Sequence, residues 1–224
     1  MSISIIYITN TIIPDTNWKN KCPIINDVLI VTEKDYPLNN DFSTKRNYCL
    51  KIAKNDWCLF LDTDETPSPQ LIEWLNHFDN KQYKIKRTDT FLNKKLFFGE
   101  TGNFYITRLV NRKYGKFVGK VHETWQSKKP IYKLMTPILH NSHLSLDSFL
   151  QKINFYSDIR AKELFDKKIK TNLFQIIFYP KAKFIQNYFL KLGFLDGTPG
   201  IINAFGMSFH SFLVRSKLWH MQQH

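Results

Sequence analysis

The sequence predicts an α/β fold, in which a mixed sheet is flanked by helices and followed by a helical C-terminal extension. Two short apolar runs, at residues 3–8 and 28–31, have the spacing of strand, connector and strand at the start of a nucleotide-binding sheet. A third apolar run at 57–61 ends abruptly in acidic residues. From Ser145 onward, apolar residues recur at helical spacing.

The length and composition allow one α/β domain with an appendage, or two small domains, within 224 residues. We expect a division into residues 1–143, which would carry the sheet, and a helical, basic and aromatic extension at 144–224. The chain has 32 basic and 19 acidic residues and a net charge of +13. Such a charge predicts a polyanionic partner: nucleic acid, an anionic membrane surface or a phosphorylated substrate.

The cysteines and the apolar segments indicate a cellular compartment. Cys22, Cys49 and Cys58 are an odd number without metal-ligand spacing, which favours a reducing environment. No basic leader precedes an apolar core at the N-terminus, and no run reaches about eighteen apolar residues. We therefore expect a cytoplasmic protein. The basic and aromatic tail from residue 172 suits either the inner face of a membrane or an ordinary helical lid.

Two helices are predicted beside the acidic run. Ser43 is the expected N-cap of a helix over 44–54, with Lys45 and Arg46 in its first turn, where the helix dipole disfavours cations unless an anion lies nearby. A second, amphipathic helix is predicted over 68–78, behind Pro67.

The middle of the chain reads as several short strands. They are predicted at residues 83–86, 95–98, 104–110, 116–121 and 137–140. The spacing of Gly115, Gly119 and Lys120 is one residue short of a P-loop, and no helical pattern follows it, which argues against an NTPase.

The acidic run Asp62-Thr63-Asp64 is the strongest functional signal. Carboxylates at the C-terminal end of a buried strand lie where open α/β sheets bind ligands. Two aspartates one residue apart can bind a divalent cation that is also bound by substrate phosphates. Three alternatives stay open: Asp62, Asp64 and Thr66 cap the next helix, Asp62 is the nucleophile of an aspartyl-phosphate phosphatase, or the domain only binds a ligand.

A further resemblance comes from motifs that share one order along the chain. Residues 42–65 resemble the helix and metal-motif strand of family 2 glycosyltransferases of the GT-A fold, particularly the lipopolysaccharide-core glucosyltransferase-like branch. The resemblance continues through 108–110 and 119–123. It extends to His140, to short motifs at 145–157 and to Gly-Phe-Leu-Asp-Gly at 193–197, and so covers most of residues 1–219.

The resemblance implies a GT-A-like, Rossmann-like fold and a metal-dependent, inverting hexosyltransferase of lipopolysaccharide or related cell-envelope polysaccharide biosynthesis. The implied co-substrate is a nucleoside-diphosphate sugar, with a UDP-sugar as first choice, used with Mg²⁺ or Mn²⁺. The implied acceptor is a hydroxyl of a glycan or lipid-linked glycan. One departure is the nucleotide-binding loop after the second strand, reduced here to residues 32–35, which include Glu33 as a donor contact.

The metal and donor residues follow from the same resemblance. Asp64 is the first expected metal ligand, with Asp62 reaching the metal or the donor ribose. His140 would complete the metal or phosphate site, although a buried, hydrogen-bonded histidine fits its position as well. Arg46 and Lys45, together with Arg108, are expected phosphate or acceptor contacts.

The attacking hydroxyl needs a general base opposite the leaving group. Glu123 is the expected base because it follows Val-His in the motif after the β-rich region, and Glu65 is its rival. The structural alternative for Glu123 is an ion pair with Arg108 or Arg112.

The main alternative of another class is a nucleic-acid-binding protein that uses its positive charge and interleaved aromatic residues. No nucleic-acid-binding motif is visible in the sequence, and the acidic run would repel phosphates unless it bound a metal ion. We therefore expect no nucleic-acid partner.

Overall fold

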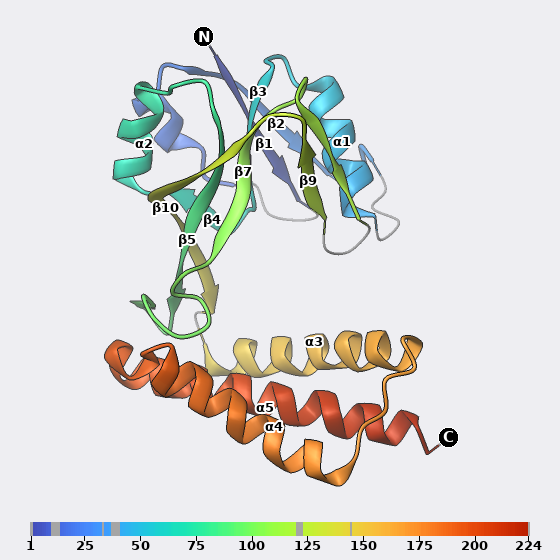
Figure 1. Cartoon of the computed structure of the whole chain (residues 1–224). Helices are drawn as coiled ribbons and strands as arrows, with labels where there is room; N and C mark the ends of the chain where they lie inside the picture. Colours follow the sequence, from blue (N-terminus) through green and yellow to red (C-terminus); the bar gives the residue numbers. More distant parts are fainter. Residues whose placement is uncertain are drawn as a thin grey trace. The chain divides into compact units, whose positions relative to one another are not determined.

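The computed structural model describes residues 2–9, 14–32, 34–36, 41–119, 123–143 and 145–223 (Figure 1). The chain divides into two compact units. Unit 1 comprises Met1–Arg87 and Tyr105–His140, and unit 2 comprises Thr88–Phe104 and Asn141–His224. The segment 88–104 therefore groups with the C-terminal helices, which the sequence did not indicate.

Unit 1 contains the sheet and two helices that cover it. Its elements in chain order are β1 (Ile3–Ile8), the 3-10 helix η1 (Asn17–Lys21), β2 (Ile25–Val31), α1 (Phe42–Ile52), β3 (Trp57–Leu61), β4 (Glu65–Pro67), α2 (Pro69–Asn76), β5 (Gln82–Phe91), β7 (Tyr105–Asn111), β8 (Gly115–Val118), β9 (Thr124–Ser127) and β10 (Ile131–His143). The last residues of β5 and β10 belong to unit 2.

The main sheet has the strand order β2-β1-β3-β7-β5-β10-β4, with the short β6 (Lys94–Lys95) paired to β5. Strand β1 pairs in parallel with β2 and with β3, whereas β7 runs antiparallel to β3. The carboxyl ends of β1, β2 and β3 therefore meet at one edge of the sheet. This mixed sheet with flanking helices confirms the predicted α/β, GT-A-like fold class.

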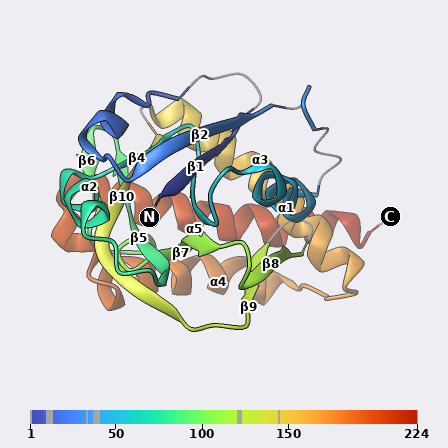
Figure 2. The ribbon, with the colours of Figure 1, turned by 90° about the horizontal axis from the view of Figure 1, so that it is seen from above.

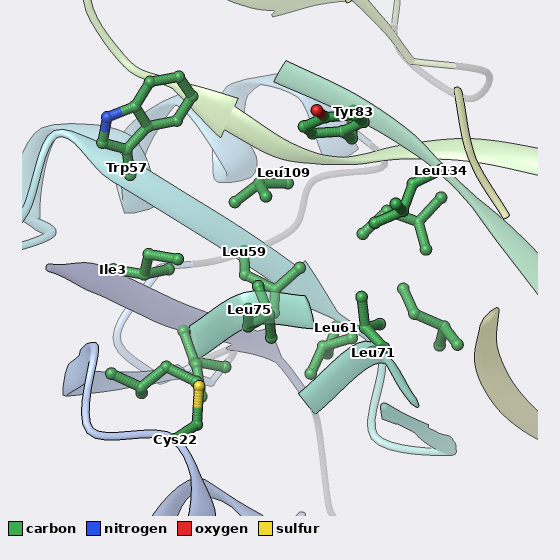
Figure 3. Packing of buried hydrophobic residues seen from close by; sticks show 14 of the residues in the cluster. Ile3, Cys22, Trp57, Leu59, Leu61, Leu71, Leu75, Tyr83, Leu109 and Leu134 are labelled. Carbon is green, nitrogen blue, oxygen red and sulfur yellow. The ribbon is translucent and has the colours of Figure 1, made fainter. Parts of the chain in front are cut away.

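Strand β3 lies at the centre of the core because every one of its residues is buried. Its side chains alternate between two faces, as the period of a strand requires. Leu59 packs in the cluster that contains α2 (Figure 3), and Phe60 packs in a second cluster, which contains α1. Figures 1 and 2 show α1 and α2 on opposite sides of these strands.

The start of α1 differs from the prediction. Its N-cap is Asp41, whose carboxylate accepts a hydrogen bond from the Thr44 backbone N–H at 2.9 Å. Ser43, the expected N-cap, lies inside the helix and donates its hydroxyl to Asp41 at 2.8 Å. The prediction was wrong by two residues because the charged carboxylate binds the helix N-terminus in place of the hydroxyl.

The amphipathic helix predicted over 68–78 is confirmed as α2, with Ser68 as its N-cap and Pro69 as its first residue. The capping alternative required Pro67 at the first helical position, which is not observed. Residues Glu65–Pro67 form β4, which pairs antiparallel with β10. The acidic residues therefore lie in the turn between two strands, and the helix-capping alternative for Asp62, Asp64 and Thr66 is excluded.

Most of the remaining strand predictions were correct in place but not in length. Strand β10 is much longer than predicted, and β9 was not predicted. The strand predicted at 95–98 was wrong, because only Lys95 of that range belongs to β6. Residues 120–122 lie outside the described residues, so the predicted end of the strand at 116–121 is not covered.

Unit 2 contains a layer of three long helices, which confirms the predicted helical extension. Helix α3 (Leu146–Asp166), capped by Ser145, and α4 (Leu173–Ile185) both pack against α5 (Gly197–Met221). The π-helix η2 (Gln186–Leu190) and the 3-10 helix η3 (Gly193–Asp196) connect α4 to α5. In the part of the chain that the structure describes, no helix has both the length and the apolar character that crossing a bilayer requires.

All three cysteines are buried and free, as the absence of paired spacing suggested. Burial raises the pKa of Cys22 and of Cys49 to about 11 and that of Cys58 to about 12. These thiols are therefore core residues and are protonated at neutral pH.

Candidate functional site

The turn that follows β3 is held closed by its own hydrogen bonds. The backbone N–H of Asp62 donates to the Glu65 carboxylate at 3.1 Å, and the backbone N–H of Glu65 donates to the Asp62 carbonyl at 3.0 Å. The Glu65 side chain is completely buried. Glu65 is thus part of the framework of the turn, which makes it a poor rival to Glu123 as a base that must meet an acceptor.

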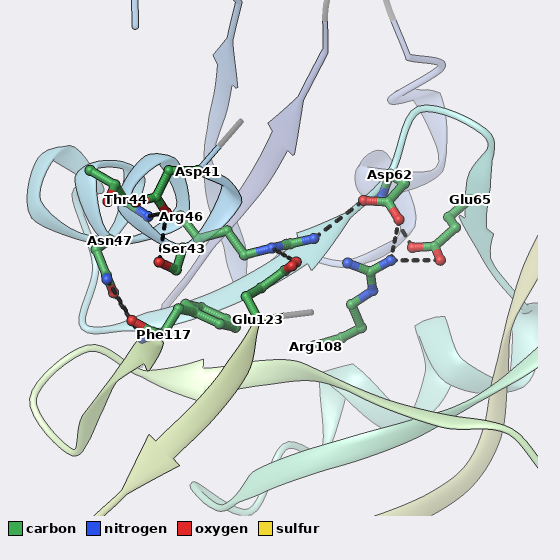
Figure 4. A network of polar contacts seen from close by, with 10 residues as sticks. All are labelled: Asp41, Ser43, Thr44, Arg46, Asn47, Asp62, Glu65, Arg108, Phe117 and Glu123. Atoms are coloured by element: carbon green, nitrogen blue, oxygen red, sulfur yellow. Dashed lines mark hydrogen bonds and ion pairs between the residues drawn. The ribbon is translucent and has the colours of Figure 1, made fainter. Parts of the chain in front are cut away.

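Arg108 joins both acids of this turn from the neighbouring strand β7 (Figure 4). Its guanidinium donates to the Asp62 carboxylate and, at 2.7 Å, to the Glu65 carboxylate. The Arg108 side chain is only 5% exposed. Because a buried charge is costly without a partner, this pairing fixes the positions of both acids.

The arginines determine the charge state of Asp62. Burial by itself would raise the pKa of Asp62, but the guanidiniums of Arg108 and Arg46 outweigh it and hold that pKa at about 2. Asp62 is therefore ionised at all physiological pH values.

Arg46 connects Asp62 to Glu123. Its Nε donates to the Glu123 carboxylate at 2.9 Å, and its terminal nitrogen lies 3.6 Å from Asp62 (Figure 4). Its guanidinium carbon lies 5.1 Å and 5.5 Å from the ring centres of Phe60 and Phe117, a cation–π arrangement on both. A cation near the start of a helix is unfavourable unless anions lie nearby. The carboxylates of Asp62 and Glu123 are these anions for Arg46.

Helix α1 is fixed to strand β8 beside this arginine. The Asn47 side chain donates to the Phe117 carbonyl at 2.8 Å and accepts from the Phe117 backbone N–H at 2.9 Å (Figure 4). These two bonds hold the Phe117 ring against Arg46. The sequence analysis missed Phe60, Phe117 and Asn47, because no local pattern joins residues that lie so far apart in the chain.

Asp64 faces a different partner. Its carboxylate lies 3.2 Å from Nε2 of His140, a residue of β10 that is in register with Glu65 of β4. Burial raises the pKa of Asp64, but the hydrogen bond and charge of His140 lower it more, so its pKa is below the usual value. The Asp64 side chain is 44% exposed. His140 lies within a long strand and not at a strand end as expected.

The expected metal ligands are only partly brought together. Within the described ranges, no three His, Cys, Asp or Glu side chains come close enough to one another to enclose a metal ion. Asp64 and His140 do form a pair, and their oxygen and nitrogen donors fit a Mg²⁺ or Mn²⁺ ion that takes its other ligands from substrate phosphates and water. Asp62 instead faces two arginines. Its role as a third ligand stays a prediction.

Of the two remaining expected donor contacts, one is buried and the other is outside the described residues. Lys45, on α1, has a completely buried side chain. Glu33 falls outside the residues that the structure describes. The Asp35 carboxylate accepts hydrogen bonds from the backbone N–H and the hydroxyl of Thr32, both at 2.8 Å.

Comparison of the sequence with known proteins finds relatives that are all named for one activity. The chain is similar to an "uncharacterized glycosyltransferase" of Rickettsia bellii, with 28% identity over 196 residues, covering 78% of this chain and 65% of the relative. Similar proteins of Rickettsia conorii and Rickettsia prowazekii carry the same description, at 27% and 26% identity over 193 residues. The chain spans 65–68% of the length of these curated relatives. No family model matches the chain.

Removal of the Arg108 guanidinium is expected to destabilise the fold. Arg108→Met leaves Asp62 and Glu65 without their buried partner, so the free energy of unfolding should fall by about 3 kcal/mol or more. Urea unfolding followed by circular dichroism measures this. The matched control is Arg160→Met. Arg160 is half exposed and ion-paired with Glu163, so its loss should lower the free energy of unfolding by less than about 1 kcal/mol. Equal costs for the two variants would contradict the framework role of Arg108.

The low pKa of Asp62 predicts an acid-sensitive contribution to stability. The pKa is about 2 in the folded protein and about 3.9 in an unfolded chain, so the folded state binds fewer protons between these values. The stabilisation by ionised Asp62 is therefore fully present above about pH 4 and is lost as the pH falls toward 2. Urea unfolding from about pH 6 to about pH 2.5 should show the difference between wild type and Asp62→Asn shrinking in this window. A difference that is independent of pH would argue against the arginine clamp on Asp62.

Proposed function

We propose that the chain is a glycosyltransferase, an enzyme that moves a sugar from a nucleoside-diphosphate sugar to the hydroxyl of a glycan or lipid-linked acceptor. The observation that carries this proposal is the position of the partly exposed Asp64, paired with His140 and close in the chain to the arginine-bound Asp62, at the carboxyl end of β3. This is the edge at which open α/β sheets bind ligands. The printed names of the Rickettsia relatives support the same activity.

The charge balance of the site favours a cation together with a diphosphate. The site has four carboxylates and three arginines, so a diphosphate alone would meet a net negative charge. The carboxylates are those of Asp62, Asp64, Glu65 and Glu123, and the arginines are Arg46, Arg87 and Arg108. Asp64 and His140 would hold Mg²⁺ or Mn²⁺, which when bound supplies positive charge for the leaving diphosphate. Arg46 and Arg108 keep Asp62 ionised and oriented toward the donor.

Glu123 is the proposed general base. Arg46 holds one oxygen of its carboxylate at 2.9 Å and so fixes the direction of the group. The carboxylate takes the proton of the acceptor hydroxyl as that oxygen bonds to the anomeric carbon of the sugar. The bond from the anomeric carbon to the diphosphate oxygen breaks on the opposite side, so the configuration inverts.

The narrower assignment rests on the motif resemblance. We propose an acceptor of the cell-envelope polysaccharide type and membership in the lipopolysaccharide-core branch of family 2. A UDP-sugar is the first donor to test.

The donor site predicts a metal-dependent thermal shift. In a panel of nucleoside-diphosphate sugars, one donor with Mn²⁺ should raise the melting temperature by about 5 to 10 °C at a concentration about a hundredfold above its Kd. Asp64→Ala should abolish this shift, because it removes the exposed carboxylate of the pair with His140. The control, Asp166→Ala at the exposed end of α3, should keep it. Stabilisation by single-stranded oligonucleotides alone, lost in salt, would favour the nucleic-acid-binding alternative.

If Glu123 is the general base, its substitution should lower turnover without weakening donor binding. Glu123→Gln keeps the shape of the side chain but cannot accept the proton, so kcat should fall by about a hundredfold or more. The donor-induced thermal shift should stay unchanged. The control is Glu73→Gln on the exposed side of α2, with near wild-type turnover. Equal losses of turnover and donor binding would assign Glu123 a structural role.

A further inference from the structure

The connection between α4 and α5 presents an unusual density of exposed apolar side chains. We call residues 189–195, Phe-Leu-Lys-Leu-Gly-Phe-Leu, the apolar tip. In Figure 1 it lies at the end of unit 2 where α4 gives way to α5. The exposed fractions of its large apolar residues are 54% for Phe189, 75% for Leu190, 44% for Leu192, 43% for Phe194 and 54% for Leu195. Five such residues within seven positions concentrate exposed apolar side chains in one short segment, which water solvates poorly.

The backbone of the tip is held in place from behind by tight and polar contacts. Leu192 has a left-handed conformation with φ of 57°, which is unfavourable for a large side chain. A Cβ at Gly193 would lie 2.6 Å from the Asn187 carbonyl, so only glycine fits there. The Asp196 carboxylate accepts the backbone N–H groups of Phe97 and Phe98 at 3.0 and 2.9 Å. The structure thus maintains a strained turn whose apolar side chains face outward.

Helix α4 extends this surface. None of its residues, all of which the structure describes, is buried. Phe174, Phe178, Lys181 and Ile185 follow one another at helical spacing, and we call them the α4 stripe. The two phenylalanine rings stack at 4.2 Å, and Lys181 lies 5.4 Å from the centre of the Phe178 ring. The chain continues from the stripe through η2 to the apolar tip.

Positive charge predominates around this surface, and the nearby Glu100 carboxylate is ion-paired with Lys183 at 2.9 Å and accepts a hydrogen bond from the Asn187 side chain at 3.0 Å. Residues 167–224 contain eight lysines and arginines and a single acidic residue, Asp196. That acid is bound to backbone N–H groups, as described above. The surface therefore combines exposed phenylalanine and leucine with lysine and has little negative charge to oppose an anionic partner.

We propose that the apolar tip and the α4 stripe together dock on a lipid bilayer that contains anionic lipid. Phenylalanine and leucine side chains would enter the boundary between head groups and acyl chains, and Lys181 and Lys191 would extend toward lipid phosphates. A second copy of the chain fits less well, because lysine is depleted in the cores of protein interfaces, whereas Lys191 lies in the middle of the tip. This inference does not depend on glycosyl transfer.

Co-sedimentation of the full chain with vesicles tests the proposal. Vesicles of phosphatidylcholine with about 30% phosphatidylglycerol should bind the protein at least about tenfold more strongly than pure phosphatidylcholine vesicles, and less strongly in high salt. The double variant Leu190→Ser and Leu195→Ser should reduce this binding about tenfold or more. The variant Lys181→Gln and Lys191→Gln should remove most of the preference for anionic vesicles.

The control changes two other exposed apolar residues of unit 2. Leu150→Ser and Phe155→Ser on α3 are 42% and 60% exposed in the native protein, and they should alter vesicle binding by less than about twofold. Circular dichroism of each variant shows that it is folded. Equal loss in the control and tip variants would overturn the proposal. A different result would also overturn the proposal: sedimentation velocity shows that the wild type is a dimer and the tip variant a monomer, while the tip variant binds vesicles as strongly as the wild type.

Discussion

The buried guanidinium of Arg108 is the constraint on which the site depends. It enters from β7 between two carboxylates that belong to the turn after β3, and almost none of it reaches water. A charge in this position is stable only while both acids remain beside it. These ion pairs hold the turn in one arrangement. They therefore also fix the position of Asp64, although Asp64 does not contact Arg108 in either pair.

The ion pairs with the arginines give Asp62 and Asp64 different surroundings. Asp62 lies toward two arginines, and through Arg46 it is connected to Glu123. Asp64 lies toward His140 and remains half exposed. An aspartyl-phosphate phosphatase would need Asp62 as a nucleophile, yet the Asp62 carboxylate is paired with two arginines. The pairing of Asp64 with a histidine instead suits a residue that shares a cation with a substrate diphosphate.

The two units have different surface chemistry, and each kind suits a different part of a reaction on a lipid-linked acceptor. Unit 1 concentrates buried charges at the carboxyl ends of parallel strands, where a small polar ligand is bound and oriented. Unit 2 exposes phenylalanine, leucine and lysine on α4 and the apolar tip, where no small-molecule chemistry is implied. If both proposals hold, one chain carries the chemistry and the means of reaching an acceptor at a membrane surface.

The sequence by itself determined the elements: the apolar run of β3, the acids that follow it and the helical pattern of α3 depend on neighbours a few residues away, and such patterns can be read locally. The sequence left open whether the acids cap α2, because β4 forms only by pairing with β10, about seventy residues later. Tertiary structure alone decided the partner of each charge. Arg108 meets Asp62 across 46 residues of chain and Arg46 meets Glu123 across 77, because folding brings β7, α1 and the β3 edge together, and no local pattern specifies that meeting.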